Sequence, residues 1–479
     1  MTDTVLIGVD QGTSGTRTVA FDERLRPLAE AYRPARVRHP QPGWIEKDAA
    51  ETVTTVADSV AEVLGRVEGA EVAGVGLDNE GETAVAWDAD SGAPLAPAVV
   101  WGCRRSQPIV DRLEERGDGP AIERLSGLPL DPYFSATKMR WLAEHSPAVA
   151  EAATGGRLRM GTLDAYLTER LGDGARTEPS TAARTQLQGL RAPGDWDDRL
   201  LKLHGVERGW LATVGDSCGE LGSLCGVPLR AMLVDQTASL AGHGCVREGM
   251  LKATYGTGIF ALQHAGGGPP EVAGLLPVVA WGSAGAAAYA LDGGVFSAGT
   301  VMQWLRDGLG AIADAAESET LAGSVPDTGG VHFLPALAGL GAPWWLPEAR
   351  ASFGGITAGT TRAHLVRAAL DALCFRVRDI VDALPQRPSM LRVDGGLTAN
   401  GYLVQRQADV LGIPVLVAAV AETTALGAAA MAGVGAGLFG LDDVPALVSG
   451  GRTVEPQDSA RAEADYAAWR AWAEVAARG

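Results

Sequence analysis

Several features typical of other protein classes are missing from this chain of 479 residues. Its five cysteines are scattered without a C-x-x-C pair, and the seven histidines show no ligand spacing with them, which argues against a zinc site or a disulfide framework. No apolar run approaches the roughly 20 residues that a membrane helix needs, and the N-terminus lacks the pattern of a signal peptide. We therefore expect a reduced, cytoplasmic protein that does not enter a membrane.

An excess of positive charge is missing as well. The chain has 58 acidic and 40 basic residues and a formal net charge of −18, which argues against nucleic acid as a partner. Two common nucleotide motifs also fail. No G-x-x-x-x-G-K-[ST] occurs, and the one G-x-G-x-x-G, at Gly435, Gly437 and Gly440, falls at the end of an expected helix, where packing explains it better.

The length and the alternation of patterns predict an α/β protein of two large domains. Hydrophobic residues make up 46% of the chain and charged residues 20%, as in ordinary globular proteins. A junction soon after Asp235 divides the chain into domains 1–245 and 246–479. Strands are expected at 5–9, 17–21, 72–77 and 83–87, and helices at 49–64, 238–242, 363–384, 425–440 and 460–477.

Three apolar strands run directly into an aspartate followed by small or polar residues. These aspartates are Asp10, Asp235 and Asp394. A carboxylate at a strand end can hold a hydrated metal ion or accept a proton, and neighbouring Gly, Thr and Ser expose donors that suit phosphate oxygens. Three such strand ends, spread over the whole chain, predict one nucleotide cleft between two domains.

The turn after Asp10 presents several adjacent N–H groups that suit phosphates, and Asp10 would bind Mg²⁺ through water. Taken alone, this segment could equally be an ordinary hairpin; Asp235 and Asp394 favour the functional interpretation. The glycines after Asp394 would let an adenine ring lie on bare backbone. A simple strand-to-helix turn is the alternative there.

At this point the sequence resembles the FGGY carbohydrate kinases, within the superfamily of sugar kinases, heat-shock protein 70 and actin. Two family signatures are nearly intact, at 133–145 and 354–371. Within the family the sequence is most similar to the glycerol kinases, and the resemblance covers nearly the whole chain in order. The further matching segments are 41–46, 100–105, 131–135, 254–258 and 339–345.

The resemblance implies two domains with a ribonuclease-H-like core, and ATP and a small polyol in the cleft between them. It implies an ATP-dependent phosphotransferase with Asp235 as general base and Asp10 as the Mg²⁺ residue. The implied phosphate and nucleotide residues are Gly12, Thr13, Ser14, Arg17, Thr257, Gly299, Gln303, Gly396 and Asn400. The implied substrate residues are Gly81, Glu82, Trp101, Tyr133, Asp235, Gln236 and Phe260.

One departure from the glycerol kinases concerns the substrate. They have Gln and Arg where this chain has Glu80 and Gly81, and that Arg binds two glycerol hydroxyls. A buried hydrogen bond to a charged group contributes roughly 1.5–3 kcal/mol. We therefore expect weaker glycerol binding and room for a four- or five-carbon polyol or ketose, such as erythritol, ribitol, xylulose or ribulose. The alternative is that Arg104 or Arg105 compensates.

Other classes in the superfamily fit less well. A peptide-binding chaperone would add a β-rich domain and a helical lid, and this chain has only one more helix after its second domain. A non-catalytic sugar-binding regulator would be expected to lose the base or the phosphate loop, yet Asp235 and Thr13 are present. A homodimer is left open.

Overall fold

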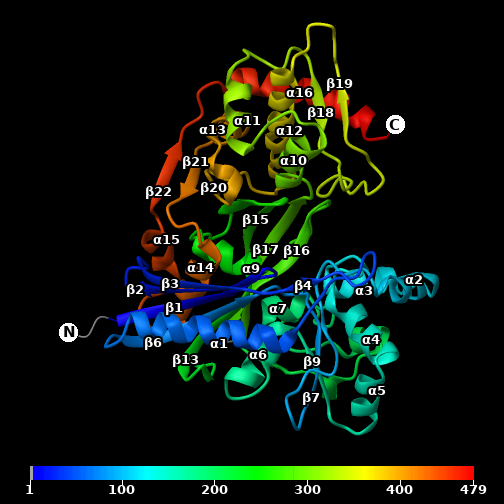
Figure 1. Ribbon diagram of the computed structural model, residues 1–479, viewed down its shortest axis with the longest axis vertical. Coiled ribbons are helices and arrows are strands. Elements are labelled where there is room, and N and C mark those ends of the chain that lie inside the picture. Colours follow the sequence, from blue (N-terminus) through cyan, green and yellow to red (C-terminus); the bar gives the residue numbers. More distant parts are fainter. Residues whose placement is uncertain (1–3, 284, 479) are drawn as a thin grey trace.

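The computed structural model describes residues 4–283 and 285–478, and it folds into two lobes (Figure 1). The first lobe is built on a six-stranded sheet of order β12-β13-β6-β1-β2-β3. These strands are β1 (Thr4–Gln11), β2 (Gly15–Asp22), β3 (Pro27–Pro34), β6 (Glu71–Asn79), β12 (Ser223–Leu224) and β13 (Val227–Val234). Strands β13, β6 and β1 are parallel, whereas β2 and β3 continue the sheet antiparallel.

The second lobe is built on a seven-stranded sheet of order β16-β17-β15-β14-β20-β21-β22. Its strands are β14 (Leu251–Tyr255), β15 (Ile259–Gly266), β16 (Leu276–Ser283), β17 (Ala286–Val295), β20 (Leu391–Asp394), β21 (Val415–Ala418) and β22 (Gly451–Val454). The order β17-β15-β14-β20-β21 repeats β3-β2-β1-β6-β13 of the first lobe, with the same strand directions. The two lobes therefore share one core topology.

Helices cover both sheets, and the five predicted helices correspond to α1, α9, α12, α14 and α16. The first lobe carries α1 (Ala49–Arg66), α2 (Gln107–Glu115), α3 (Gly119–Ser126), α4 (Ser135–His145), α5 (Pro147–Thr154), α6 (Leu163–Leu171), α7 (Pro179–Ala183), α8 (Asp198–His204) and α9 (Asp235–Gly242). The later helices are α10 (Gly299–Gln303), α11 (Ala315–Gly323), α12 (Arg362–Ala383), α13 (Gly401–Leu411), α14 (Thr423–Gly435), α15 (Val444–Leu447) and α16 (Ser459–Ala476).

Short strands complete both lobes. They are β4 (Val37–Arg38), β5 (Glu46–Lys47), β7 (Val85–Asp88), β8 (Ala98–Val99), β9 (Leu158–Gly161), β10 (Arg176–Thr177), β11 (Thr213–Val214), β18 (His332–Leu334) and β19 (Ser352–Gly354). In the described residues, no helix combines the length and apolarity needed to cross a membrane. All five cysteines are free thiols.

Helix α14 comes late in the chain but packs on the first sheet, beside α9 at the waist of the molecule (Figure 1). The fit depends on glycine, because a Cβ on Gly8 would lie 1.9 Å from the Ala425 carbonyl oxygen and one on Gly76 would lie 2.0 Å from that of Ala428. The prediction of a tightly packed helix in this Gly- and Ala-rich run is confirmed. The division into domains 1–245 and 246–479 stays a prediction.

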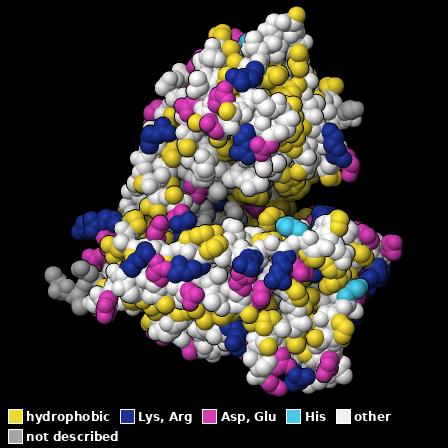
Figure 2. Space-filling model, in the orientation of Figure 1, with side chains coloured by type: hydrophobic (Ala, Val, Ile, Leu, Met, Phe, Trp, Pro, Cys, Tyr) yellow, Lys and Arg dark blue, Asp and Glu magenta, His cyan; other side chains and the backbone are white. Residues whose placement is uncertain are grey.

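The core at the waist joins the two lobes. One cluster of buried residues combines Leu6 of β1, Ala238 of α9 and Ala425 of α14 with Leu262 of β15 and Ala290 of β17. Beside this shared core the surface is hollowed between the lobes (Figure 2). The ends of β1, β6 and β13 lie at this junction, next to the start of α9.

Candidate active site

Three aspartates meet where the parallel strands β1, β6 and β13 end. Asp10 lies directly opposite Asp78 in the strand register, and Leu233 of β13 lies opposite Asp78 on its other side. Asp235 follows two residues later as the first residue of α9. Side chains alternate along a strand, so all three carboxylates project from the same face. We call Asp10, Asp78 and Asp235 the carboxylate cluster.

The carboxylate cluster is buried, and burial favours the protonated form of its three side chains. Burial raises the pKa of Asp10 to about 6, and burial with the charges of Glu82 and Asp10 raises the pKa of Asp235 to about 7. Asp78 is fully buried, and burial raises its pKa well above the usual range. Asp78 and Asp10 share a side-chain hydrogen bond, which raises the pKa of Asp78 and lowers that of Asp10. Two carboxyl groups this close together suit a hydrated divalent cation when both are ionised.

A hydrated cation fits the carboxylate cluster better than a bare one. Among residues 4–283 and 285–478, no group of three or more His, Cys, Asp or Glu side chains is arranged to hold a metal ion. Mg²⁺ keeps most of its water ligands in proteins and contacts one or two carboxylates. The water-mediated role predicted for Asp10 stays a prediction.

The predicted phosphate loop forms the turn between β1 and β2. The Gly12 N–H donates to the Gly15 carbonyl at 2.9 Å, and the Thr13 hydroxyl accepts from Trp101 Nε1 at 2.9 Å. Ser14 is exposed at the tip. Arg17 Nε lies 3.0 Å from Glu422 at the start of α14, so this cation reaches across to the later part of the chain. The loop is therefore continuous with the carboxylate cluster.

A buried ion pair beneath this loop was missed in the sequence. Lys47 and Glu80 form it, with their side chains 1% and 3% exposed. The Thr13 hydroxyl donates to the second oxygen of Glu80 at 2.8 Å, and Lys47 Nζ lies 3.5 Å from the Gly12 carbonyl. The pair links the loop to β5 and to the end of β6. Glu80 therefore has a structural role, as the partner of Lys47 and Thr13.

The residues predicted to hold the substrate gather beside the carboxylate cluster. The rings of Trp101 and Tyr133 meet edge to face with centroids 5.6 Å apart. Trp101 is 39% exposed. Buried Lys138 donates to the Glu82 carbonyl at 3.3 Å and to the Tyr133 carbonyl. The charges of Glu82 and Asp235 both act on the Tyr133 hydroxyl. Glu82, Tyr133 and Asp235 therefore form one polar group.

Two further predicted substrate residues lie on either side of the junction between the lobes. Gln236 follows Asp235 and accepts a hydrogen bond from Lys252 Nζ of β14 at 3.0 Å. Phe260 of β15 pairs with Gly294 of β17, so its ring lies on the same face as Asp292. The second lobe thus supplies both an apolar ring and a carboxylate near the substrate residues.

The empty space expected beside Gly81 is not there. A Cβ on Gly81 would lie 2.4 Å from Cγ2 of Val234 and 3.4 Å from Cγ of Arg184. Arg184 instead fills this region and forms an ion pair with Glu82. The prediction of room for a longer substrate is therefore wrong, because a side chain distant in sequence occupies the place.

The two arginines suggested as replacements do not lie there either. Arg105 pairs with Glu46 at 2.8 Å and stacks over Trp44 at 4.1 Å from its ring centroid. Arg104 donates to Gln107 at 2.7 Å. Both guanidinium groups are held by partners outside the Glu82 group.

We expect Gly81→Ala to lower the free energy of unfolding by about 1–3 kcal/mol, because the new Cβ overpacks against Val234. Gly81→Arg should cost at least as much, and it should lower kcat/KM for small polyols instead of raising it. Urea unfolding measures the change. The control is Gly65→Ala in α1, where a Cβ meets nothing within 4 Å and helix propensity favours alanine. Unchanged stability of Gly81→Ala would restore the idea of an open space.

Three of the predicted nucleotide residues converge in the second lobe. Thr254 of β14 lies opposite Asp394 of β20, which brings the turn at Thr257 next to the one at Gly396. Gly299, at the start of α10, donates through its N–H to the Gly256 carbonyl at 3.0 Å. These backbone turns form a shared edge that suits a nucleotide.

The other two nucleotide residues lie at helix ends, Asn400 before the start of α13 and Gln303 at the end of α10. Asn400 accepts from the Leu403 N–H at 2.9 Å and donates to Ser318 at 3.0 Å, so it caps α13 and links it to α11. Gln303 is exposed at the end of α10. Their roles toward a nucleotide stay predictions.

The third strand-end aspartate, Asp394, binds protein groups instead of facing an open edge. Its carboxylate lies 3.5 Å from His243 Nε2, just after α9, and accepts a hydrogen bond from the Thr423 hydroxyl of α14. Burial alone would raise the pKa of Asp394, but His243 and then Lys252 hold it below its usual range. Asp394 thus ties the second sheet to both helices at the waist.

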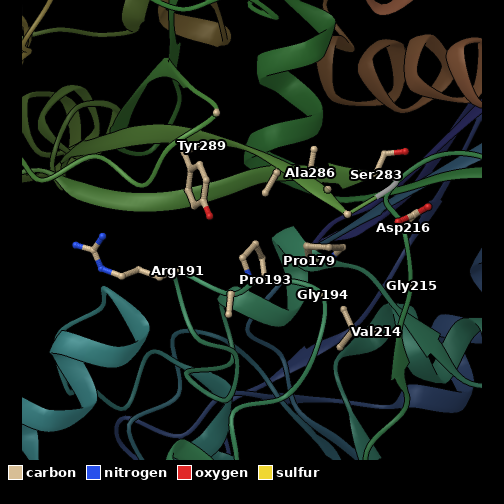
Figure 3. Close-up of a pocket in the computed structure, with 15 residues that line it drawn as sticks. Pro179, Arg191, Pro193, Gly194, Val214, Gly215, Asp216, Ser283, Ala286 and Tyr289 are labelled. Carbon is tan, nitrogen blue, oxygen red and sulfur yellow. The ribbon is translucent and has the colours of Figure 1, made fainter.

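A separate hollow lies between the β16–β17 hairpin and loops of the first lobe (Figure 3). Its volume is about 610 Å³, and it is lined among others by Pro179, Arg191, Asp216, Ser283 and Tyr289. None of the residues predicted to bind substrate or nucleotide lines it. This hollow is therefore separate from the residues predicted to bind substrate and nucleotide.

Comparisons with known proteins place the chain in a family. Residues 5–240 match the N-terminal domain, and residues 251–436 the C-terminal domain, of the FGGY family of carbohydrate kinases. The chain is 40% identical to a glycerol kinase of Stenotrophomonas maltophilia over 98% of each chain.

Two solved structures extend the comparison. The Plasmodium falciparum glycerol kinase with ADP is 28% identical with a TM-score of 0.92, covering 99% of this chain and 98% of that one. A xylulose kinase of Lactobacillus acidophilus, 19% identical with a TM-score of 0.88 over 98% and 97%, shares the fold. Each lobe has the ribonuclease-H-like core of the sugar kinase, heat-shock protein 70 and actin superfamily. The chain belongs to the FGGY family of carbohydrate kinases, and it is an ATP-dependent kinase.

Proposed function

We propose that the chain transfers the γ-phosphoryl group of ATP to a primary hydroxyl of glycerol, with Asp235 as general base. The observation that carries this proposal is the position of Asp235 between two sets of groups. The charges of Glu82 and Asp10 both act on its carboxylate, so it lies between the substrate residues and the phosphate loop. A base in this position can accept the proton of a hydroxyl that attacks a phosphoryl group.

The remaining residues would orient the two reactants. Glu82 and the Tyr133 hydroxyl supply polar partners for the hydroxyls of a polyol, while the rings of Trp101 and Phe260 supply apolar walls for its carbon atoms. Because the Gly12 N–H already donates to the Gly15 carbonyl, the N–H groups of Thr13 and Ser14 would hold phosphate oxygens. Phosphoryl transfer depends mainly on such positioning and on charge stabilisation.

Mg²⁺ is proposed as the metal that accompanies ATP. The adjacent carboxyl groups of Asp10 and Asp78, opposite one another in the strand register, support the fit of a hydrated cation at the carboxylate cluster. When bound there, Mg²⁺ would neutralise negative charge on the transferred phosphate. A cytoplasmic location is also proposed, supported by the five free thiols. A homodimer stays a prediction.

A substrate panel tests the proposed function. We expect glycerol to give the highest kcat/KM in an assay of ADP release, ahead of erythritol, ribitol, xylulose and ribulose, because Arg184 fills the space that a longer substrate would need. The four-carbon polyol should be at least tenfold poorer. A four- or five-carbon substrate that outperforms glycerol would overturn the choice of substrate while leaving the kinase assignment intact.

A further inference from the structure

Arg184 places a guanidinium group among the proposed substrate residues. It is the C-cap residue of α7, and its side chain is 12% exposed. Nε donates to Glu82, and the guanidinium carbon lies over the rings of Tyr133 and Phe134, 5.6 and 5.3 Å from their centroids. Packing on two rings and an ion pair hold the group in one orientation.

Most donors of this guanidinium are left without a partner. The group carries five N–H donors, yet among the hydrogen bonds of the described residues only Nε of Arg184 takes part. Its Nη1 faces Asp292 of β17 at 4.0 Å, a distance too long for a hydrogen bond. The other Asp292 oxygen, Oδ1, is buried and has no partner among the described residues. Arg184 Nη1 therefore stands just beyond hydrogen-bonding distance of one Asp292 oxygen, while the other oxygen of that carboxylate is buried without a partner among the described residues.

The charges of these two side chains suit a neutral polar ligand. Burial alone would lower the pKa of Arg184, but the charges of Glu82, Tyr133 and Asp292 hold it above its ordinary value, so the group stays cationic. Burial raises the pKa of Asp292, which Arg184 and then Lys252 oppose. A hydroxyl is the smallest group that both accepts from a guanidinium and donates to a carboxylate.

We propose that Arg184 and Asp292 together bind one hydroxyl of the polyol, other than the hydroxyl that is phosphorylated. This inference rests on the proposed function and adds the residues that select the substrate. Arg184 belongs to the first lobe and Asp292 to the second, so the bound hydroxyl would join the two lobes. The aliphatic Cγ of Arg184 lies beside Gly81, and the guanidinium group farther along this side chain would supply the cation that position 81 lacks.

Substrates that lack one hydroxyl test the pairing. We expect Arg184→Lys and Asp292→Asn each to lower kcat/KM for glycerol by about 10- to 100-fold, as expected for a lost hydrogen bond to a charged group. Propane-1,2-diol and propane-1,3-diol each lack one hydroxyl of glycerol. With the diol that lacks the bound hydroxyl, both variants should lose less than threefold relative to the parent. The other diol should show the full loss.

The control is Arg105→Lys, which alters a buried guanidinium paired with Glu46 instead of Glu82 and should change none of the three kcat/KM values by more than threefold. A parent that phosphorylates none of the three compounds would overturn the proposed function itself. A parent active on glycerol, with variants that lose nothing or lose equally on all three substrates, would overturn only the role of Arg184 and Asp292.

A crystal structure of the parent chain with glycerol gives a second test that needs no variant. We expect one glycerol hydroxyl within about 3.2 Å of both an Arg184 nitrogen and an Asp292 oxygen. If the variants do not fold, this structure decides the question. Glycerol bound in the cleft without contact to either side chain would overturn the inference.

Discussion

Asp235→Asn is expected to lower kcat by about 10²- to 10⁴-fold, the range that general bases contribute. The amide keeps the shape of the side chain but cannot accept the proton of the attacking hydroxyl. Nucleotide binding should persist, because the backbone turns at Thr257 and Gly396 lie in the other lobe. Single-turnover kinetics and ADP titration measure the two properties. Asp307→Asn, at an exposed pair with Arg306, is the matched control and should behave as the parent.

The pH dependence of kcat/KM also tests whether Asp235 is the general base. The pKa of Asp235 is raised to about 7, and only the ionised carboxylate accepts a proton. We expect the kcat/KM of the parent to fall as the pH drops through about 7, and to level off above it. The variant should lose this limb of the profile. Near-normal turnover in Asp235→Asn would show that another group is the base.

Removal of this buried charge should also stabilise the free protein. A carboxyl whose pKa is higher in the folded protein than in the unfolded chain favours folding at low pH, and this contribution is lost as the pH rises from about 4 through about 7. At pH 8 the charged Asp235 therefore destabilises the fold, and Asp235→Asn should raise the free energy of unfolding by about 1–4 kcal/mol. Urea unfolding at pH 8 and at pH 4 measures the difference, which should disappear at pH 4.

Asp10→Ala is expected to lower kcat by about 10²-fold or more and to weaken the dependence on Mg²⁺. The change removes one of the two carboxylates proposed to hold the hydrated ion, while Asp78 remains. Activity measured over a range of Mg²⁺ concentrations should show a shifted midpoint, and Mn²⁺ binding in the presence of ADP should weaken in parallel.

The control for Asp10→Ala is Asp22→Ala, at the opposite end of the same hairpin. Asp22 pairs with Arg26 there, far along the strands from the phosphate loop, so its loss should leave the metal dependence unchanged. If the Asp10→Ala variant keeps the parent's activity and metal titration curve, the hairpin around Asp10 is not part of the phosphate and metal site.

Local patterns in the sequence were sufficient for much of the fold and for the first carboxylates. The hairpin around Asp10, the helix α12 and the strand leading to Asp235 all follow from residues that are neighbours in the chain. Asp78 is the second-last residue of β6, as Asp10 is of β1, so the signal that located Asp10 could have located Asp78 as well.

The remaining site residues depend on contacts that no local pattern encodes. Arg184 meets Glu82 across 102 residues, and it follows a short helix without any motif. Lys47 lies in β5, which pairs with β8, and this pairing brings it to Glu80. The sequence thus indicated that a cation is missing at Gly81. Only the packing of α7 against β13 shows that Arg184 lies beside this position.

Identification of the product tests the central claim most directly. The purified chain is incubated with ATP, Mg²⁺ and ¹³C-labelled glycerol, and the phosphate ester is observed by ³¹P and ¹³C NMR. The account predicts one ester, at a primary carbon, formed in equal amount to the ADP released, and none in Asp235→Asn. Release of ADP without any ester, or an ester at the secondary carbon, would contradict it.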